Sequence, residues 1–153
     1  MTIKIFIASS AELNQERKEL VDLMQDLIDE TGGQAIKFKT KLWEFMDSSM
    51  GEKHKEEEYL EKLRECDICI VLFWLTLGEY TVKELDVAIS EMHAGKLPKL
   101  VYVLFKEPYD GISDELMRFK ESFSQRYPHV PVQTFNNKKM LRELVAIFIS
   151  TKL

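Results

Sequence analysis

The chain has 153 residues, of which 45% are hydrophobic and 31% charged, and its formal net charge is −5. This length fits one domain with its own core, and the composition excludes a disordered or fibrous protein. The basic residues are scattered among acids, which argues against direct nucleic-acid binding, and no apolar run approaches the about 20 residues that cross a bilayer.

The chain opens with an apolar strand, expected over residues 3–8. Ser9 and Glu12 follow it with the spacing of a capping box, in which Ser9 is the N-cap and Glu12 occupies the third helical position. The apolar residues after them recur at helical spacing. This pattern predicts a helix that ends near Gly32 and Gly33, which can adopt the left-handed conformation typical of helix ends.

The second and third units are less regular. Residues 34–43 predict a strand, the polar stretch 44–55 with Gly51 a loop, and residues 56–64 a short charged helix. The charged run 52–58 is most simply the solvated start of that helix, with an acidic docking site as the alternative. Residues 67–74 form the most apolar segment, which is typical of a central parallel strand that is covered on both faces.

The remaining elements alternate in the same way. Gly95 and Ser113 mark a helix end and a helix N-cap. The expected elements are a helix at 82–94, a strand at 97–105, a helix at 114–126, a strand at 132–135 and a last helix at 138–151. Five βα units predict an α/β fold: a five-stranded parallel sheet with helices on both faces, of the flavodoxin-like kind. We expect one domain over residues 1–153. The first residues lack a signal peptide, so a cytoplasmic location is predicted.

Cys66 and Cys69 are the two cysteines of the chain, in a C-x-x-C spacing that invites a zinc or redox interpretation. On a strand, residues three apart point to opposite faces and cannot share a metal ion. No second Cys or His pair is present. We therefore expect buried, reduced thiols and no metal. His54, His93 and His129 lack a partner acid or nucleophile at a motif spacing and are expected in solvent.

Ligands of open parallel sheets bind beyond the carboxyl ends of the strands, where the first three loops should converge. Ser9 and Ser10 offer hydroxyls and backbone N–H groups at a helix N-terminus, suited to a ribose or phosphate. A helix cap explains these serines equally well. The chain lacks the glycine-rich sequences of dinucleotide-binding Rossmann domains and of P-loop proteins.

Glu84 lies in the first turn of the predicted helix that follows the third strand, so the predicted fold brings it to this crevice. The helix dipole alone favours an acidic residue at that position. Helical spacing places Leu85 and Ala88 toward the sheet, and Lys83 and Asp86 toward solvent.

The sequence resembles a TIR-like family, similar to Toll/interleukin-1 receptor (TIR) domains, over roughly residues 3–105. The resemblance rests on the opening Ile-Phe-Ile-Ala-Ser-Ser, Glu16-Arg17, Trp43-Glu44, Gly51, Cys66-Asp67-Ile68 and Gly78-Glu-Tyr-Thr-Val-Lys-Glu84. In TIR domains that hydrolyse NAD, the catalytic residue is the glutamate of the helix after strand three, and Glu84 matches it. The usual Ser-x-Trp-Cys before that glutamate is replaced here by Tyr80-Thr81-Val82.

The resemblance implies an NAD nucleosidase that cleaves the nicotinamide–ribose bond, activated by self-association in a signalling or defence role. NAD would be the substrate, and no cofactor is implied. Glu84 would stabilise the positive charge that develops on the ribose. Ser9 and Ser10 would bind a ribose or phosphate, Trp43 or Tyr80 would stack on a ring, and Thr81 would contact the substrate.

Two alternatives remain open at this stage. A nucleoside deoxyribosyltransferase-like enzyme also places a nucleophilic glutamate on a helix after a central strand, and Thr81-Val-Lys-Glu84 echoes its motif, although Asp86 stands where that motif has glycine. A TIR-type interaction module without activity is the second alternative, and the charged segment 44–58 would suit such assembly.

Overall fold

A computed structural model describes residues 2–9, 11–30, 37–41, 52–107 and 111–152. Five parallel strands form one sheet in the order β2-β1-β3-β4-β5. The strands are β1 Thr2–Ser9, β2 Lys37–Lys41, β3 Ile68–Phe73, β4 Leu100–Lys106 and β5 Val132–Phe135. The helices are α1 Asn14–Glu30, α2 Glu52–Leu63, α3 Glu79–His93, α4 Asp114–Arg126 and α5 Lys138–Lys152, with a 3-10 turn, η1, at Ala11–Leu13.

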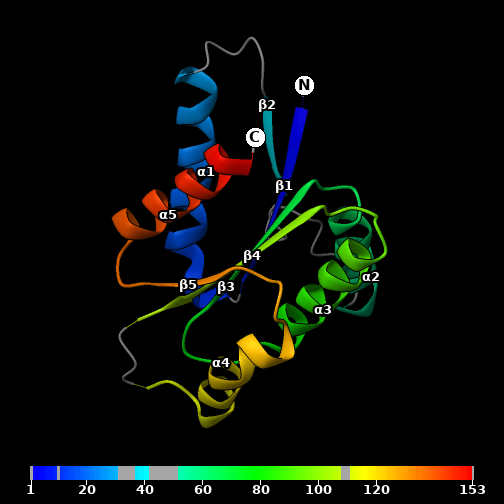
Figure 1. Cartoon of the computed structure of the whole chain (residues 1–153), viewed down its shortest axis with the longest axis vertical. Coiled ribbons are helices and arrows are strands. Elements are labelled where there is room, and N and C mark those ends of the chain that lie inside the picture. Colours follow the sequence, from blue (N-terminus) through cyan, green and yellow to red (C-terminus); the bar gives the residue numbers. More distant parts are fainter. Residues whose placement is uncertain (1, 10, 31–36, 42–51, 108–110, 153) are drawn as a thin grey trace.

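Helices cover both faces of the sheet (Figure 1). α1 and α5 lie together on one side, while α2, α3 and α4 lie on the other. The strand order reverses between β1 and β3, which makes the carboxyl ends of these two strands the expected ligand-binding region of the fold. The molecule is therefore a three-layer, Rossmann-like α/β domain.

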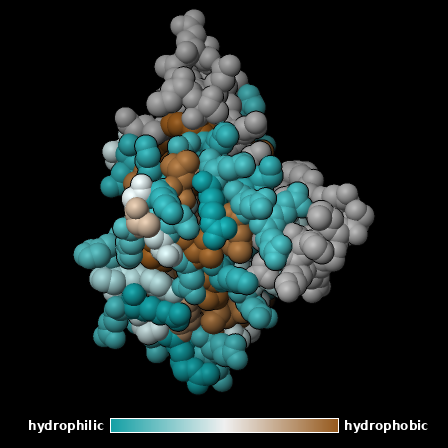
Figure 2. Space-filling model, turned by 90° about the vertical axis from the view of Figure 1, so that its right-hand side faces the viewer, coloured by the Kyte–Doolittle hydropathy of each residue, from teal (hydrophilic) through white to brown (hydrophobic). Residues whose placement is uncertain are grey.

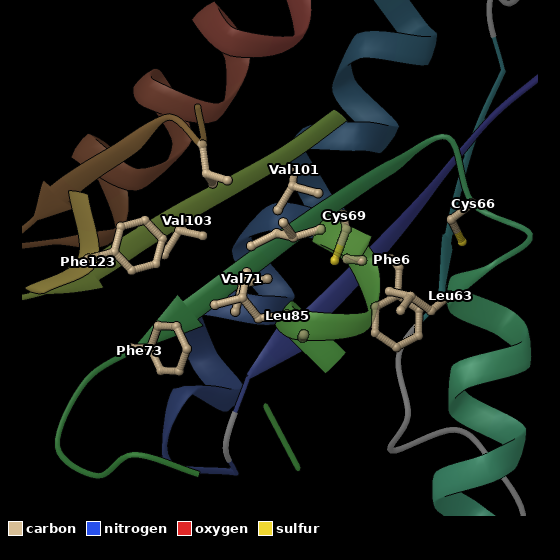
Figure 3. Packing of buried hydrophobic residues seen from close by; sticks show 14 of the residues in the cluster. Phe6, Leu63, Cys66, Cys69, Val71, Phe73, Leu85, Val101, Val103 and Phe123 are labelled. Atoms are coloured by element: carbon tan, nitrogen blue, oxygen red, sulfur yellow. The ribbon is translucent and has the colours of Figure 1, made fainter. Parts of the chain in front are cut away.

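The central strand β3 explains why two cores form. All six of its residues are buried, and they alternate between the faces. Ile68, Ile70 and Leu72 join the core under α1 and α5. Cys69 and Val71 join the core under α2, α3 and α4, where Leu85 of α3 packs on the same side (Figure 3). The prediction of a central strand covered on both faces is confirmed.

Two helix ends follow the signals in the sequence. The Ser113 hydroxyl accepts a hydrogen bond from the Leu116 N–H at 3.2 Å, so α4 begins at the expected N-cap. At the end of α3, Gly95 has a φ of 75°, and its N–H donates to the Met92 carbonyl while the Lys96 N–H donates to the Glu91 carbonyl. This pair of bonds is the Schellman motif, which requires the left-handed residue that glycine supplies.

The structure corrects the start of two predicted helices. α2 begins at Glu52 instead of residue 56, and α3 begins at Glu79 instead of residue 82, which places Glu84 in its second turn instead of its first. β2 covers Lys37–Lys41, and the rest of the predicted strand 34–43 lies outside the described residues. β2 is an edge strand whose sequence alternates lysines, and edge strands are commonly charged because pairing on their outer side is unwanted. β1, β3, β4 and β5 each contribute residues to the two buried cores.

The cysteine geometry also differs from the prediction. Cys66 and Cys69 are fully buried thiols that form no disulfide, as expected, but they belong to the same core. Cys66 lies before β3 begins, in a turn where its thiol donates to the Lys62 carbonyl at 3.2 Å, so strand alternation does not apply to it. No cluster of potential metal ligands occurs among the described residues.

The outer surface of the α2 and α3 side is mostly hydrophilic, with a band of hydrophobic side chains between the polar ones (Figure 2). His93 and His129 are exposed, as predicted, and His54 lies outside the described side chains. Within the described ranges, no helix is long and apolar enough to span a membrane.

Candidate active site

Helix α3 carries Glu84 on its buried face. Thr81, Glu84, Leu85, Ala88 and Ile89 are its buried residues, and their spacing of three and four is that of one helical face. Glu84 is only 6% exposed, although glutamate side chains are rarely buried in proteins. The predicted contacts of Leu85 and Ala88 with the sheet are confirmed, and the predicted exposure of Lys83 and Asp86 is also confirmed. α3 thus turns a carboxylate into the protein.

The charge of Glu84 affects the pKa values of two neighbouring side chains, which shows where its carboxylate lies. Burial, and then the charge of Glu84, raise the pKa of the Cys69 thiol in β3 well above its usual range. Burial, and then the charges of Glu58 and Glu84, raise the pKa of the Tyr59 phenol in α2. Because its charge raises the pKa of both Tyr59 in α2 and Cys69 in β3, the Glu84 carboxylate lies where α3 faces α2 and the sheet. The negative charge also keeps Cys69 protonated, so this thiol is not an activated nucleophile.

A second acidic residue belongs to this region. Glu58 of α2 acts on the same phenol as Glu84. Its Oε2 atom is buried and accepts no hydrogen bond from the described part of the chain. From the sequence, Glu58 was expected in a solvated helix start, because it ends a run of charged residues. The structure therefore brings two carboxyl groups and a phenol to the contact between α2 and α3.

The other predicted site residues are placed in different ways. Thr81 is buried one turn before Glu84, whereas Tyr80 is 47% exposed on the outer side of α3. Ser9 is buried at the end of β1, where it continues the alternation of Ile5 and Ile7 toward the α1 and α5 face. Glu84 is on the opposite face. Ser10 and Trp43 lie outside the described residues.

Glu12 of η1 connects two segments of the chain at the topological switch point between β1 and β3. Its Oε1 atom accepts hydrogen bonds from the backbone N–H groups of Leu75 at 3.1 Å and Thr76 at 3.4 Å, in the loop that follows β3. The predicted capping box is therefore corrected in one respect: this carboxylate crosses to another loop, and α1 begins at Asn14, after the 3-10 turn. Glu12 joins the segments that follow β1 and β3.

A buried charged group on the opposite face escaped the sequence analysis. Lys106 at the end of β4 donates to Glu16 of α1 at 2.5 Å, and its ammonium group lies 3.8 Å from the centre of the Trp74 ring. Arg17 is 1% exposed and donates to the Asn14 side chain at 2.9 Å. The sequence did carry a signal for their burial, because positions 16 and 17 share the helical spacing of the apolar residues on the buried face of α1.

Comparison with known proteins supports the fold without naming a family. No family model matches the chain, and no curated protein matches it. Among solved structures, the CMP N-glycosidase BcmB of Clostridium botulinum is similar, with a TM-score of 0.55 and 19% identity over 94% of this chain and 98% of that one. A de novo designed Rossmann 2x3 protein has a TM-score of 0.50 and 18% identity over 99% and 91% of the two chains. These likenesses show a Rossmann-like α/β fold, and the TIR-like resemblance stays a prediction.

Proposed function

We propose that the chain hydrolyses the N-glycosidic bond of a nucleotide, with Glu84 as the catalytic carboxylate. The observation that carries this proposal is the burial of Glu84 on the inner face of α3, where its charge raises the pKa of Tyr59 and Cys69. A buried carboxylate acts in a medium of low effective dielectric constant, where its interaction with a developing positive charge is stronger than in water.

The reaction asks for such a group. As the bond between the base and C1′ of the ribose breaks, the sugar approaches an oxocarbenium ion, and a fixed carboxylate stabilises this charge more than it stabilises the substrate. Water then bonds to C1′, and its proton is released. Glu58 and the Tyr59 hydroxyl, which share the region with Glu84, are suited to orient the ribose hydroxyls or this water.

NAD is the first candidate substrate, since nicotinamide leaves its cationic ring as a neutral molecule and needs no general acid. The TIR-like resemblance supports this choice. CMP is the second candidate, favoured by the likeness to a CMP N-glycosidase. Cytosine is a poorer leaving group that needs a proton, so this reaction would require a general acid beside Glu84.

The test is product formation from each nucleotide, followed by chromatography, at several protein concentrations, because activation by self-association is part of the proposal. Nicotinamide from NAD or cytosine from CMP is expected. Glu84→Gln should lower the rate by about a hundredfold or more. The matched control is Glu79→Gln, an exposed glutamate on the same helix, which should keep the rate within about twofold.

Two results would contradict the proposal. A Glu84→Gln protein that hydrolyses at the normal rate would remove this residue from catalysis. A normal protein that releases neither base at any concentration would favour the interaction module. A third assay, with a deoxynucleoside and a free base, separates the transferase alternative, since a new deoxynucleoside would appear in place of a free sugar.

A further inference from the structure

A cavity lies beyond the carboxyl ends of β3 and β4, beside the first turns of α4. Its volume is about 340 Å³, within the range of small-molecule sites. Its apolar walls are Trp74, Phe105, Ile112, Leu116 and Met117. None of the lining residues described belongs to α2 or α3, so the cavity stands apart from the proposed catalytic carboxylate.

Two lysines also line the cavity, and each of them already contacts a carboxylate of the protein. Lys106 donates to Glu16 at 2.5 Å. Lys120 pairs with Glu107 at 3.4 Å. An anionic ligand that approached either ammonium group would therefore compete with a carboxylate that the chain itself supplies.

The third charged residue of the lining is Glu121, which is exposed on α4. An ion pair with an exposed carboxylate is weak, and it does not offset the cost of moving an ammonium group from water to apolar walls. A cationic ligand is therefore disfavoured as well. A neutral ligand needs no new ion pair and leaves those of Lys106 and Lys120 intact.

The volume and the walls together favour a ring system as the ligand. An apolar cavity of about 150 Å³ holds benzene, so a cavity of about 340 Å³ accommodates two fused rings. The half-buried Trp74 ring lies at the wall, with the Lys106 ammonium group 3.8 Å from its centre. Aromatic rings in contact attract each other beyond the effect of the area that they bury.

We propose that this cavity binds a neutral molecule with an apolar two-ring body, which packs against Trp74, Leu116 and Met117. Burial of the rings supplies most of the affinity, because the walls are largely hydrophobic. The existing ion pairs of the two lysines select against charged analogues of the same shape. This site does not depend on the proposed glycosidase activity.

The test is isothermal titration calorimetry with 2-naphthamide, 2-naphthoate and 2-naphthylmethylammonium, which share one ring system and differ in charge. The amide is expected to bind, and each ion should bind about tenfold more weakly or less. Decanamide, a neutral chain, should also bind more weakly than 2-naphthamide. The proposal is overturned if the amide does not bind, if either ion binds as tightly, or if decanamide binds more tightly.

A variant of the wall tests whether the ligand lies in this cavity. Met117 is 43% exposed, so Met117→Gln removes apolar surface from the cavity without opening the core. Binding of 2-naphthamide should weaken about fivefold. The matched control is Ile147→Gln, which changes an apolar residue that is 61% exposed on α5 and does not line the cavity; it should bind as the normal chain does.

Nuclear magnetic resonance places the ligand independently. A Trp43→Phe chain has Trp74 as its remaining tryptophan, and 2-naphthamide should shift the signal of its indole N–H. Glu84→Gln should bind the amide as the normal chain does. The proposal is also overturned if the Trp74 signal stays unchanged on binding, if Met117→Gln binds normally, or if Glu84→Gln abolishes binding.

Discussion

The two faces of the sheet bury their charges in different ways. Under α1 and α5, Glu16 meets Lys106 in a short ion pair, and Arg17 donates to a neighbouring side chain. Under α2 and α3, Glu84 lies near a phenol and a thiol whose pKa values its charge helps to raise. The first arrangement pairs opposite charges. The second places a buried carboxylate beside two groups that it helps to keep protonated.

Breaking the ion pair on the first face should have the largest effect on stability. Glu16→Ala leaves Lys106 largely buried without its partner, and removal of one member of a buried pair lowers the free energy of unfolding by about 3 kcal/mol. Chemical denaturation measures this change. The double variant Glu16→Ala with Lys106→Met should regain most of the loss, and a double variant as unstable as the single one would contradict the ion-pair explanation.

Removing the buried charge on the second face should have a smaller effect. Glu84→Gln keeps the shape of the side chain, so the free energy of unfolding should change by no more than about 1 kcal/mol. The same denaturation curves give this value. A loss as large as that of Glu16→Ala would mean that Glu84 serves stability, and the contrast between the faces would disappear.

Alkaline pH provides a third comparison. Burial, and then the charge of Glu84, hold the pKa of Cys69 above its usual range. Above about pH 9 the unfolded thiol loses its proton while the folded thiol keeps it, so the unfolded state binds fewer protons and stability falls as pH rises. The expected slope is about 1.4 kcal/mol per pH unit for this group.

The control for this slope is Cys69→Ala, which should flatten it between about pH 9 and pH 10. Above pH 10 the tyrosines Tyr59, Tyr102 and Tyr127, whose pKa values are raised chiefly by desolvation, add to the decline in both proteins. An unchanged slope in Cys69→Ala would show that the thiol does not titrate on unfolding in this range.

The smallest expected effect concerns an ion pair at the surface. Arg142 of α5 pairs with Asp26 and with Glu19 of α1, and these side chains are partly exposed. Arg142→Gln should lower the free energy of unfolding by about 0.5 kcal/mol, and added salt should reduce the difference. If this loss equalled that of Glu16→Ala, burial would not be what distinguishes the Glu16–Lys106 pair.

Local signals allowed most of the fold to be predicted. Ser113 as an N-cap gave the correct start of α4, and Gly95 gave the end of α3. The weakest prediction fell on the start of α2, where apolar residues are few and periodicity gives little information.

The candidate site was less predictable, because its residues take their roles from contacts between distant segments. Glu12 carried a sequence signal for a helix cap, and only the approach of the loop after β3 gives it a different partner. Glu58 is one of several acids in a charged run, and the contact of α2 with α3 selects it. Glu84 was found from its place in the order of elements, which is a property of topology.

The hydrogen bonds of Glu12 couple the positions of two segments of the chain. This side chain fastens the turn after β1 to the backbone that leads into α3. A displacement of either segment therefore strains these hydrogen bonds. Because only a short connection separates Thr76 from α3, a movement of Leu75 and Thr76 also displaces the start of the helix that carries Glu84. Glu12 thus couples the segment after β1 to the loop after β3, and it restricts how far the start of α3 can move.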